Sequence, residues 1–284
     1  MNRQSAFAVA CAVSATAALG VVASPAGAFE LAPGATIFTT PVSLDNFFNP
    51  DGTSNDNAFQ VDDKIFHNFF FQVACQAPGT PADPRTCDEI KNLPAVARPI
   101  GPLNPADITV SGSKNSLSPK SGPGLTFNDF WRADPGWGYD LLLGFDVHVL
   151  DPDKQITDVH LGVVLDRPLD NGTIMIGEKV TDIDTGLSLL DKGVLAVDNL
   201  SSTTDIGTED WADLIYPVKK LRVLKDIQLL GVDDKTKVLE KATFTGLKQE
   251  FSQTVPEPGT VTGLLAIGSL SVGAMLKRHF GKKA

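Results

Sequence analysis

The chain has 284 residues, of which 34 are acidic and 24 are basic, giving a formal net charge of −10. Five of the basic residues lie in the first 28 or the last 25 positions, which hold no acidic residue, so the central part carries 15 excess negative charges. Such a surface disfavours binding to nucleic acid or to anionic lipid, and the length is enough for one large domain or two small ones.

The first 28 residues have the pattern of a secretory signal peptide. Arg3 supplies a positive charge, and an almost wholly apolar stretch follows from Ala6 to Val22. Ala26 and Ala28 place small residues at both recognition positions, which predicts cleavage after Ala28. The alternative is an uncleaved N-terminal membrane helix.

Two cysteines, Cys75 and Cys87, remain after removal of the signal peptide. In an oxidising compartment such a close pair favours one disulfide, and the alternative is two free thiols. Closing so short a loop stabilises the fold by about 3 kcal/mol in the chain-entropy model. The Pro-rich segment near residues 76–124 is expected to be an extended surface loop tied down by this disulfide, outside the core.

Alternating apolar residues predict two long strands, at 141–149 and 159–165, joined by the turn Asp151-Pro152-Asp153-Lys154. If they pair as a hairpin, His148 lies opposite Asp158 and Asp146 lies opposite His160. Two imidazoles and two carboxylates on one sheet face are a weak candidate for a transition-metal site. The alternative is a solvated face with cross-strand charge pairs.

Further short strands, separated by clusters of Gly, Pro, Asn and Asp, complete a mainly β domain over residues 29–250. An antiparallel β-sandwich or jelly roll is therefore the expected fold. Glu209–Leu214 is expected to form one or two helical turns. The further strands are expected at residues 36–38, 64–73, 108–110, 172–179, 193–197, 215–224, 227–231 and 242–251.

An aromatic run offers a candidate for stacking on sugar rings, and its alternative is packing in the core. It comprises Phe127, Phe130, Trp131, Trp137 and Tyr139. Asp-rich turns are compatible with a structural calcium ion but define no ligand set, and no other cofactor is expected. The nucleophile, metalloprotease, phosphate-loop and dinucleotide motifs are absent from the sequence, which disfavours an enzyme.

The C-terminus combines a short polar motif, a membrane-length apolar segment and a basic tip. A linker at 251–259 holds Pro256, Glu257 and Pro258, and residues 260–276 contain no charge. The 19 uncharged residues from 258 to 276 would form a helix about 28 Å long, close to the thickness of a bilayer core. The basic residues at 277–284 are typical of a cytoplasmic flank: Lys277, Arg278, Lys282 and Lys283. The alternative is a buried C-terminal helix of a soluble domain.

This tail resembles the PEP-CTERM sorting signal of exported bacterial proteins, with Pro256, Glu257 and Pro258 matching the motif. The resemblance implies recognition by the membrane peptidase exosortase, removal or exchange of the tail, and delivery to the cell surface or the exopolysaccharide matrix. The same tail carries an ice-binding label in some family naming, but the body lacks a repeating Thr ladder. A non-catalytic surface or matrix protein is the predicted function. A carbohydrate-binding module and a secreted hydrolase are the alternatives.

Overall fold

The computed structural model describes the central part of the chain, in segments that cover residues 29, 31–76, 86–94, 97–164, 172–191, 195–199, 209–231 and 241–255. The expected signal peptide, the Pro-Glu-Pro motif and the C-terminal apolar segment lie outside these residues. Within them, no helix has the length and apolar character needed to span a bilayer.

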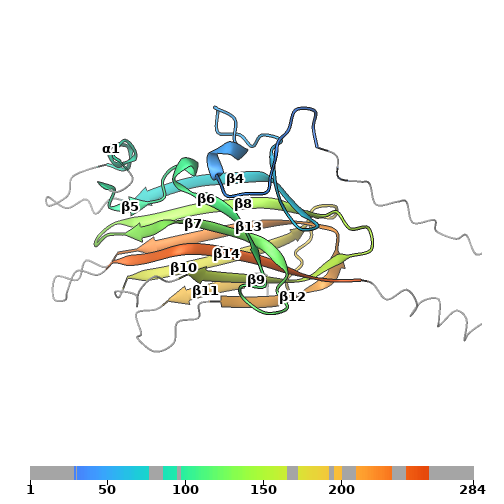
Figure 1. The fold of residues 1–284 in the computed structure, drawn as a ribbon. Helices are drawn as coiled ribbons and strands as arrows, with labels where there is room; N and C mark the ends of the chain where they lie inside the picture. Colours follow the sequence, from blue (N-terminus) through green and yellow to red (C-terminus); the bar gives the residue numbers. More distant parts are fainter. Residues whose placement is uncertain are drawn as a thin grey trace, which may run out of the picture.

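The first sheet has seven strands, and its members come from both halves of the chain (Figure 1). In spatial order they are β1 (Ile37–Phe38), β3 (Ala58–Val61), β4 (Lys64–Gln76), β8 (Gly138–Val149), β13 (Lys220–Leu230), β10 (Thr173–Asp182) and β11 (Leu195–Asn199). The β1–β3 pair is parallel, and the other pairs are antiparallel.

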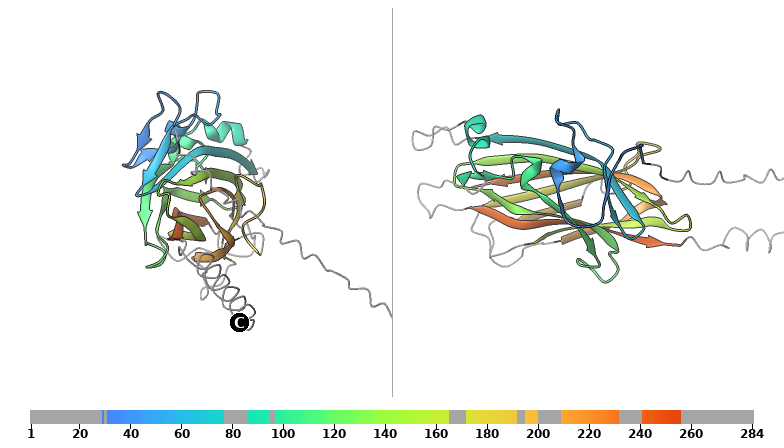
Figure 2. Two further views of the ribbon diagram at one scale, coloured as in Figure 1. Left: turned by 90° about the vertical axis from the view of Figure 1, so that its right-hand side faces the viewer. Right: turned by 45° about the horizontal axis from the view of Figure 1, so that its top comes forward.

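The second sheet lies against the first, as the two views in Figure 2 show. In spatial order it contains β12 (Glu209–Val218), β9 (Gln155–Val164), β14 (Ala242–Thr254), β7 (Pro123–Ala133), β6 (Thr109–Lys114) and β2 (Val42–Ser43), and β5 (Ile100–Gly101) also pairs with β7. Its pairs are all antiparallel. The predicted mainly β sandwich is therefore confirmed.

Apolar side chains from the inner faces of both sheets form one core. On β13 every second residue is buried, as period-two alternation requires, and Val223 and Ile227 belong to this row. Leu247 and Phe251 of β14 are buried in the same core from the second sheet.

The predicted disulfide is present. Cys75, near the end of β4, is bonded to Cys87 of α1 (Cys87–Lys91), and their Cα atoms are 6.0 Å apart. The helix begins with a capping box in which the Thr86 side chain and Glu89 exchange hydrogen bonds. α1 and β5 lie at the same end of the sandwich (Figure 1).

The predicted hairpin between 141–149 and 159–165 is wrong. β8 pairs with β4 and β13, whereas β9 pairs with β12 and β14 in the other sheet. The turn at Asp151–Lys154 therefore passes from one sheet to the other. His148 lies beside Ile65 and Lys220, and not beside Asp158. Alternation specifies which side of a strand is buried, but it does not select the neighbouring strand.

Several boundaries also differ from the predictions. The helical turns expected at Glu209–Leu214 are wrong, since this segment is the first part of strand β12. It pairs with β9 at the edge of the second sheet, and its side chains alternate between more and less exposed positions. The strand expected at 215–224 is divided between β12 and β13, and β14 extends to Thr254, beyond the strand end expected at 251.

The Pro-rich segment is not a purely external loop. It contains β6, the short 3₁₀ helix Pro105–Asp107 and a set of buried apolar residues. These residues are Ile90, Ile100, Leu103, Ile108 and Val110. The proline density therefore limits regular structure in this segment without keeping it out of the core.

Candidate functional site

The structure divides the four metal candidates between the two sheets. Asp146 of β8 is 4% exposed and is held by Arg222 through two hydrogen bonds, Nε to Oδ1 at 2.7 Å and Nη2 to Oδ2 at 2.8 Å. Asn68 Nδ2 donates a third, at 2.8 Å. Among the residues that the structure describes, no group of three His, Cys, Asp or Glu side chains is placed to hold a metal ion.

Four residues of the aromatic run, Phe127, Trp131, Trp137 and Tyr139, are part of the core, and the side chain of Phe130 lies outside what the structure describes. Trp131 is fully buried and stacks on Phe244 with ring centroids 4.9 Å apart, and Trp137 is 2% exposed. Neither indole offers a face to a ligand, so the suggestion that these two tryptophans stack on sugar rings is wrong and the packing alternative is confirmed.

One exposed tryptophan, Trp211, borders a hollow of about 460 Å³ on the outer face of the second sheet, which we call the Trp211 hollow. The hollow combines an aromatic ring, three carboxylates, a lysine and a histidine. Its lining residues are Leu117, Ser118, Pro119, Lys120, Asp158, His160, Glu209, Asp210 and Trp211.

The floor of the Trp211 hollow comes from neighbouring strands in register. Trp211 of β12 pairs with His160 of β9, and their rings are 6.2 Å apart and inclined by 21°. Trp211 is 59% exposed, so most of its indole remains available to a ligand. The His160 ring is the more buried of the two, at 8% exposure of the residue, and lies within 3.1 Å of the Asp158 carboxylate.

Asp158 is fixed as an acceptor at this floor. Its Oδ1 atom lies 3.1 Å from His160 Nε2 and accepts a hydrogen bond of the same length from the Ser252 backbone N–H. Burial acts to raise the pKa of Asp158, but the hydrogen bonds from His160 and Ser252 outweigh it and lower the pKa below its usual value. The carboxylate is therefore ionised at neutral pH.

The opposite wall is the loop of residues 115–122 between β6 and β7. Leu117 lies directly over Gly162, where an added Cβ would come within 2.4 Å of Leu117 Cδ2. A side chain at this position of β9 would require the end of the Leu117 side chain to move, so Gly162 lets Leu117 pack directly on the sheet. The loop is also joined to β14, because Ser252 Oγ donates to the Lys120 carbonyl oxygen at 2.5 Å.

The buried carboxylate of Glu250 holds the same loop. Its two oxygens accept hydrogen bonds from the Ser116 N–H at 3.0 Å, the Leu117 N–H at 3.1 Å and Ser116 Oγ at 2.6 Å. The hydroxyl groups of Ser113 and Ser121 donate as well. Glu250 pairs with His160 across β14 and β9, so this anchor adjoins the floor of the Trp211 hollow.

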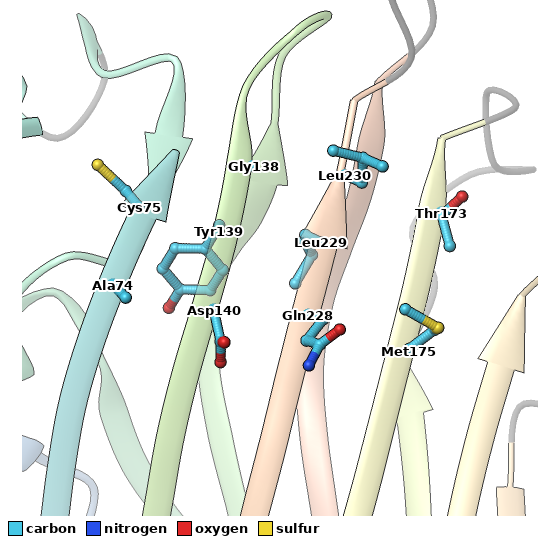
Figure 3. Close-up of a pocket in the computed structure, with 10 residues that line it drawn as sticks. All are labelled: Ala74, Cys75, Gly138, Tyr139, Asp140, Thr173, Met175, Gln228, Leu229 and Leu230. Atoms are coloured by element: carbon cyan, nitrogen blue, oxygen red, sulfur yellow. The ribbon is translucent and has the colours of Figure 1, made fainter. Parts of the chain in front are cut away.

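A second depression, of about 390 Å³, lies across the ends of β4, β8, β13 and β10 (Figure 3). Asp140 is its acidic residue, and partial burial together with repulsion and hydrogen bonding from Asp226 raises the pKa of Asp140. The ring of Tyr139 is buried, at 3% exposure. Since the aromatic ring in this lining is not exposed, the depression lacks the stacking surface that Trp211 provides.

Trp211 is not among the site candidates from the sequence, because the sequence pattern predicts helical turns at residues 209–214. The strand signal was present in the alternation of Trp211, Asp213 and Ile215 with smaller or buried neighbours. Nothing in the linear order, however, brings the loop at 115–122 next to β12 and β9.

No protein-family model matches this chain, and no curated protein matches it either. Three solved structures resemble part of it. TmCBM61 in complex with β-1,4-galactotriose is 12% identical, with 52% of this chain and 82% of that chain covered and a TM-score of 0.25. A DUF4465 family protein from Bacteroides caccae is 9% identical, with 54% and 88% covered and a TM-score of 0.23.

The third is the CBM22-2 xylan-binding domain of Paenibacillus barcinonensis Xyn10C, which is 15% identical, with 52% and 88% covered and a TM-score of 0.18. At TM-scores of 0.25 and below, these likenesses identify neither a family nor a ligand for this chain. The chemistry of the Trp211 hollow therefore has to be judged from its own residues.

Proposed function

We propose that this chain is an exported, non-catalytic β-sandwich protein that binds carbohydrate in the Trp211 hollow. The observation that carries the proposal is the exposed indole of Trp211 beside polar side chains, of which Asp158 is held in place by His160 and Ser252. A sugar ring has an apolar C–H face and a polar rim, and such a ligand matches an aromatic surface bordered by hydrogen-bonding side chains.

The polar groups favour an uncharged glycan. Asp158, Glu209 and Asp210 line the hollow, and Lys120 is the only lysine in its lining. Carboxylates accept hydrogen bonds from sugar hydroxyl groups, and the ammonium group of Lys120 donates to sugar oxygen atoms. The same carboxylates and the acidic surface of the whole domain repel polyuronates and sulfated chains, so neutral polysaccharides are the expected ligands.

Trp211→Ala is expected to weaken glycan binding about 5- to 150-fold, because loss of one stacking face removes about 1–3 kcal/mol of binding free energy. Ile215→Ala is the matched control, since Ile215 lies on the same strand and is 58% exposed, close to the 59% of Trp211. A glycan array identifies the ligand, and calorimetry with that glycan compares the variants. Equal affinity of wild type and Trp211→Ala would rule out the hollow as the binding site.

We also propose that the Pro256-Glu257-Pro258 motif directs the protein to the cell surface or the exopolysaccharide matrix through an exosortase-type peptidase. The supporting observation is the order of motif, apolar segment and basic residues at the C-terminus. Changing the three motif residues to alanine is expected to leave the tail uncleaved and the protein in the membrane fraction. Fractionation and the C-terminal mass of the recovered protein test this, and an unchanged location and mass would refute it.

A further inference from the structure

Three long polar side chains meet in the middle of the apolar core. Lys225 of β13 and Glu178 of β10 are register partners in the first sheet, and Gln249 projects from β14 in the second. All three residues are completely buried. Their inward-facing neighbours along the strands are apolar, namely Val223, Ile227, Ile176, Val180, Leu247 and Phe251.

The amino group of Lys225 lies between the other two side chains. Lys225 Nζ donates to Glu178 Oε2 and to Gln249 Oε1. Within the described part of the chain, Glu178 Oε1 and Gln249 Nε2 make no hydrogen bond of normal geometry, although the Gln249 side chain adjoins the Glu178 carboxyl group. A buried ion pair is stabilising only if its remaining donors and acceptors are satisfied, so this trio is poorly explained as a structural salt bridge.

The environment also favours the uncharged forms. Burial lowers the pKa of Lys225 below its usual value, with the Glu178 carboxylate acting in the opposite direction. Burial raises the pKa of Glu178, against the lowering effects of Lys225 and of a hydrogen bond from Gln249. A neutral lysine amine is a nucleophile, and a neutral carboxylic acid beside it is a proton donor.

We propose that Lys225 and Gln249 join in an intramolecular amide bond, with Glu178 as the residue that transfers the proton. The Nζ lone pair attacks the Gln249 side-chain carbonyl carbon, and the bond between that carbon and Nε2 breaks. Glu178 protonates the departing nitrogen and recovers a proton from Nζ. The products are a secondary amide and one molecule of ammonia, and the reaction requires no oxidant, reductant or cofactor.

The bond links β13 of one sheet to β14 of the other. It removes the amide nitrogen of Gln249 from the core and replaces a buried amine with a neutral amide. A covalent link between the sheets would also prevent them from separating fully, which is a useful property for a domain outside the cell.

Peptide mapping of the purified full-length protein tests the bond. We expect a branched peptide that contains Lys225 and Gln249, lighter by the mass of one ammonia than the sum of its two parts, and no tryptic cleavage after Lys225. Tandem mass spectrometry assigns the linked residues and separates this product from ammonia loss within a single peptide. Lys248→Met is the control, because Lys248 adjoins Gln249 but is only partly buried and should leave the link intact.

Glu178→Gln is expected to abolish the link while circular dichroism still shows a folded β protein. Should that variant fail to fold, the wild-type map decides alone. Separate linear peptides with unmodified Lys225 and Gln249, recovered from folded wild-type protein, would overturn the proposal. Loss of one water, with a link between Lys225 and Glu178, would overturn it as well.

Discussion

Glu250→Ala is expected to lower the free energy of unfolding by about 3–5 kcal/mol, because it leaves several buried and partly buried donors without their charged acceptor. The Ser116 and Leu117 N–H groups and the hydroxyls of Ser113 and Ser121 lose their partner together. Since these groups hold the loop of residues 115–122, the wall of the Trp211 hollow should loosen too. Urea titration measures the loss of stability, and hydrogen exchange at Leu117 reports on the loop.

Glu250→Gln separates charge from shape, since it keeps the side-chain volume and one acceptor oxygen. Burial acts to raise the pKa of Glu250, but the hydrogen bonds from Ser113, Ser116, Ser121 and Leu117 outweigh it and lower the pKa. A carboxylate with a lowered folded-state pKa contributes stability above its unfolded value, about 4.3, and loses that contribution as the pH falls through the folded value. The stability gap between wild type and Glu250→Gln should therefore close in acid.

Lys248→Ala provides the control, because Lys248 is next to Glu250 on β14 but is only partly buried. We expect a change below about 1 kcal/mol for this surface substitution. An unchanged exchange rate at Leu117 in Glu250→Ala would contradict the role of Glu250 as the anchor of the loop.

The inward rows of the strands could be predicted from alternation alone. Leu141, Leu143, Phe145 and Val147 were expected to share one face, and all four are buried. The partner of that strand could not be predicted, because alternation shows which face of a strand is buried and not which strand hydrogen-bonds to its edge. β8 and β9 are consecutive in the chain but belong to different sheets, so the pattern of residues was right and the pairing was wrong.

The candidate site was harder to predict for the same reason. Trp211, Asp158 and the loop at 115–122 come from three distant parts of the chain, and only the second sheet brings them together. Conversely, the expected hairpin placed Asp146, His148, Asp158 and His160 in one candidate metal site. In the structure the Asp146 carboxylate instead forms an ion pair with Arg222. The sequence also did not predict that Lys225, Glu178 and Gln249 would meet in the core. Charged residues in a strand are usually exposed, so their positions normally indicate the face of the strand that contacts solvent.

Lys64 is a second lysine buried without adequate compensation. It begins β4 and is fully buried, and its amino group has no hydrogen-bond partner among the described residues. The nearest carboxylate oxygen is Oδ1 of Asp63, at 4.0 Å. Burial lowers the pKa of Lys64 to about 7, against the attraction of Asp63 and with a further lowering from Lys154.

Because burial lowers the pKa of Lys64, folding at pH 7 must either bury its ammonium charge or release its proton, and both oppose folding. Lys64→Met removes this cost and is therefore expected to stabilise the fold at pH 7 by about 2–4 kcal/mol. Between the folded value near 7 and the unfolded value near 10.4, the unfolded chain binds more protons, so wild-type stability rises with pH through this window. The advantage of the variant should accordingly shrink between pH 7 and pH 9 in urea titrations. Lys114→Met, at a lysine whose side chain is 57% exposed and paired with Asp62, should change stability by less than about 1 kcal/mol at either pH. A variant that is less stable than wild type at pH 7 would show that the ammonium group of Lys64 is well compensated by its neighbours.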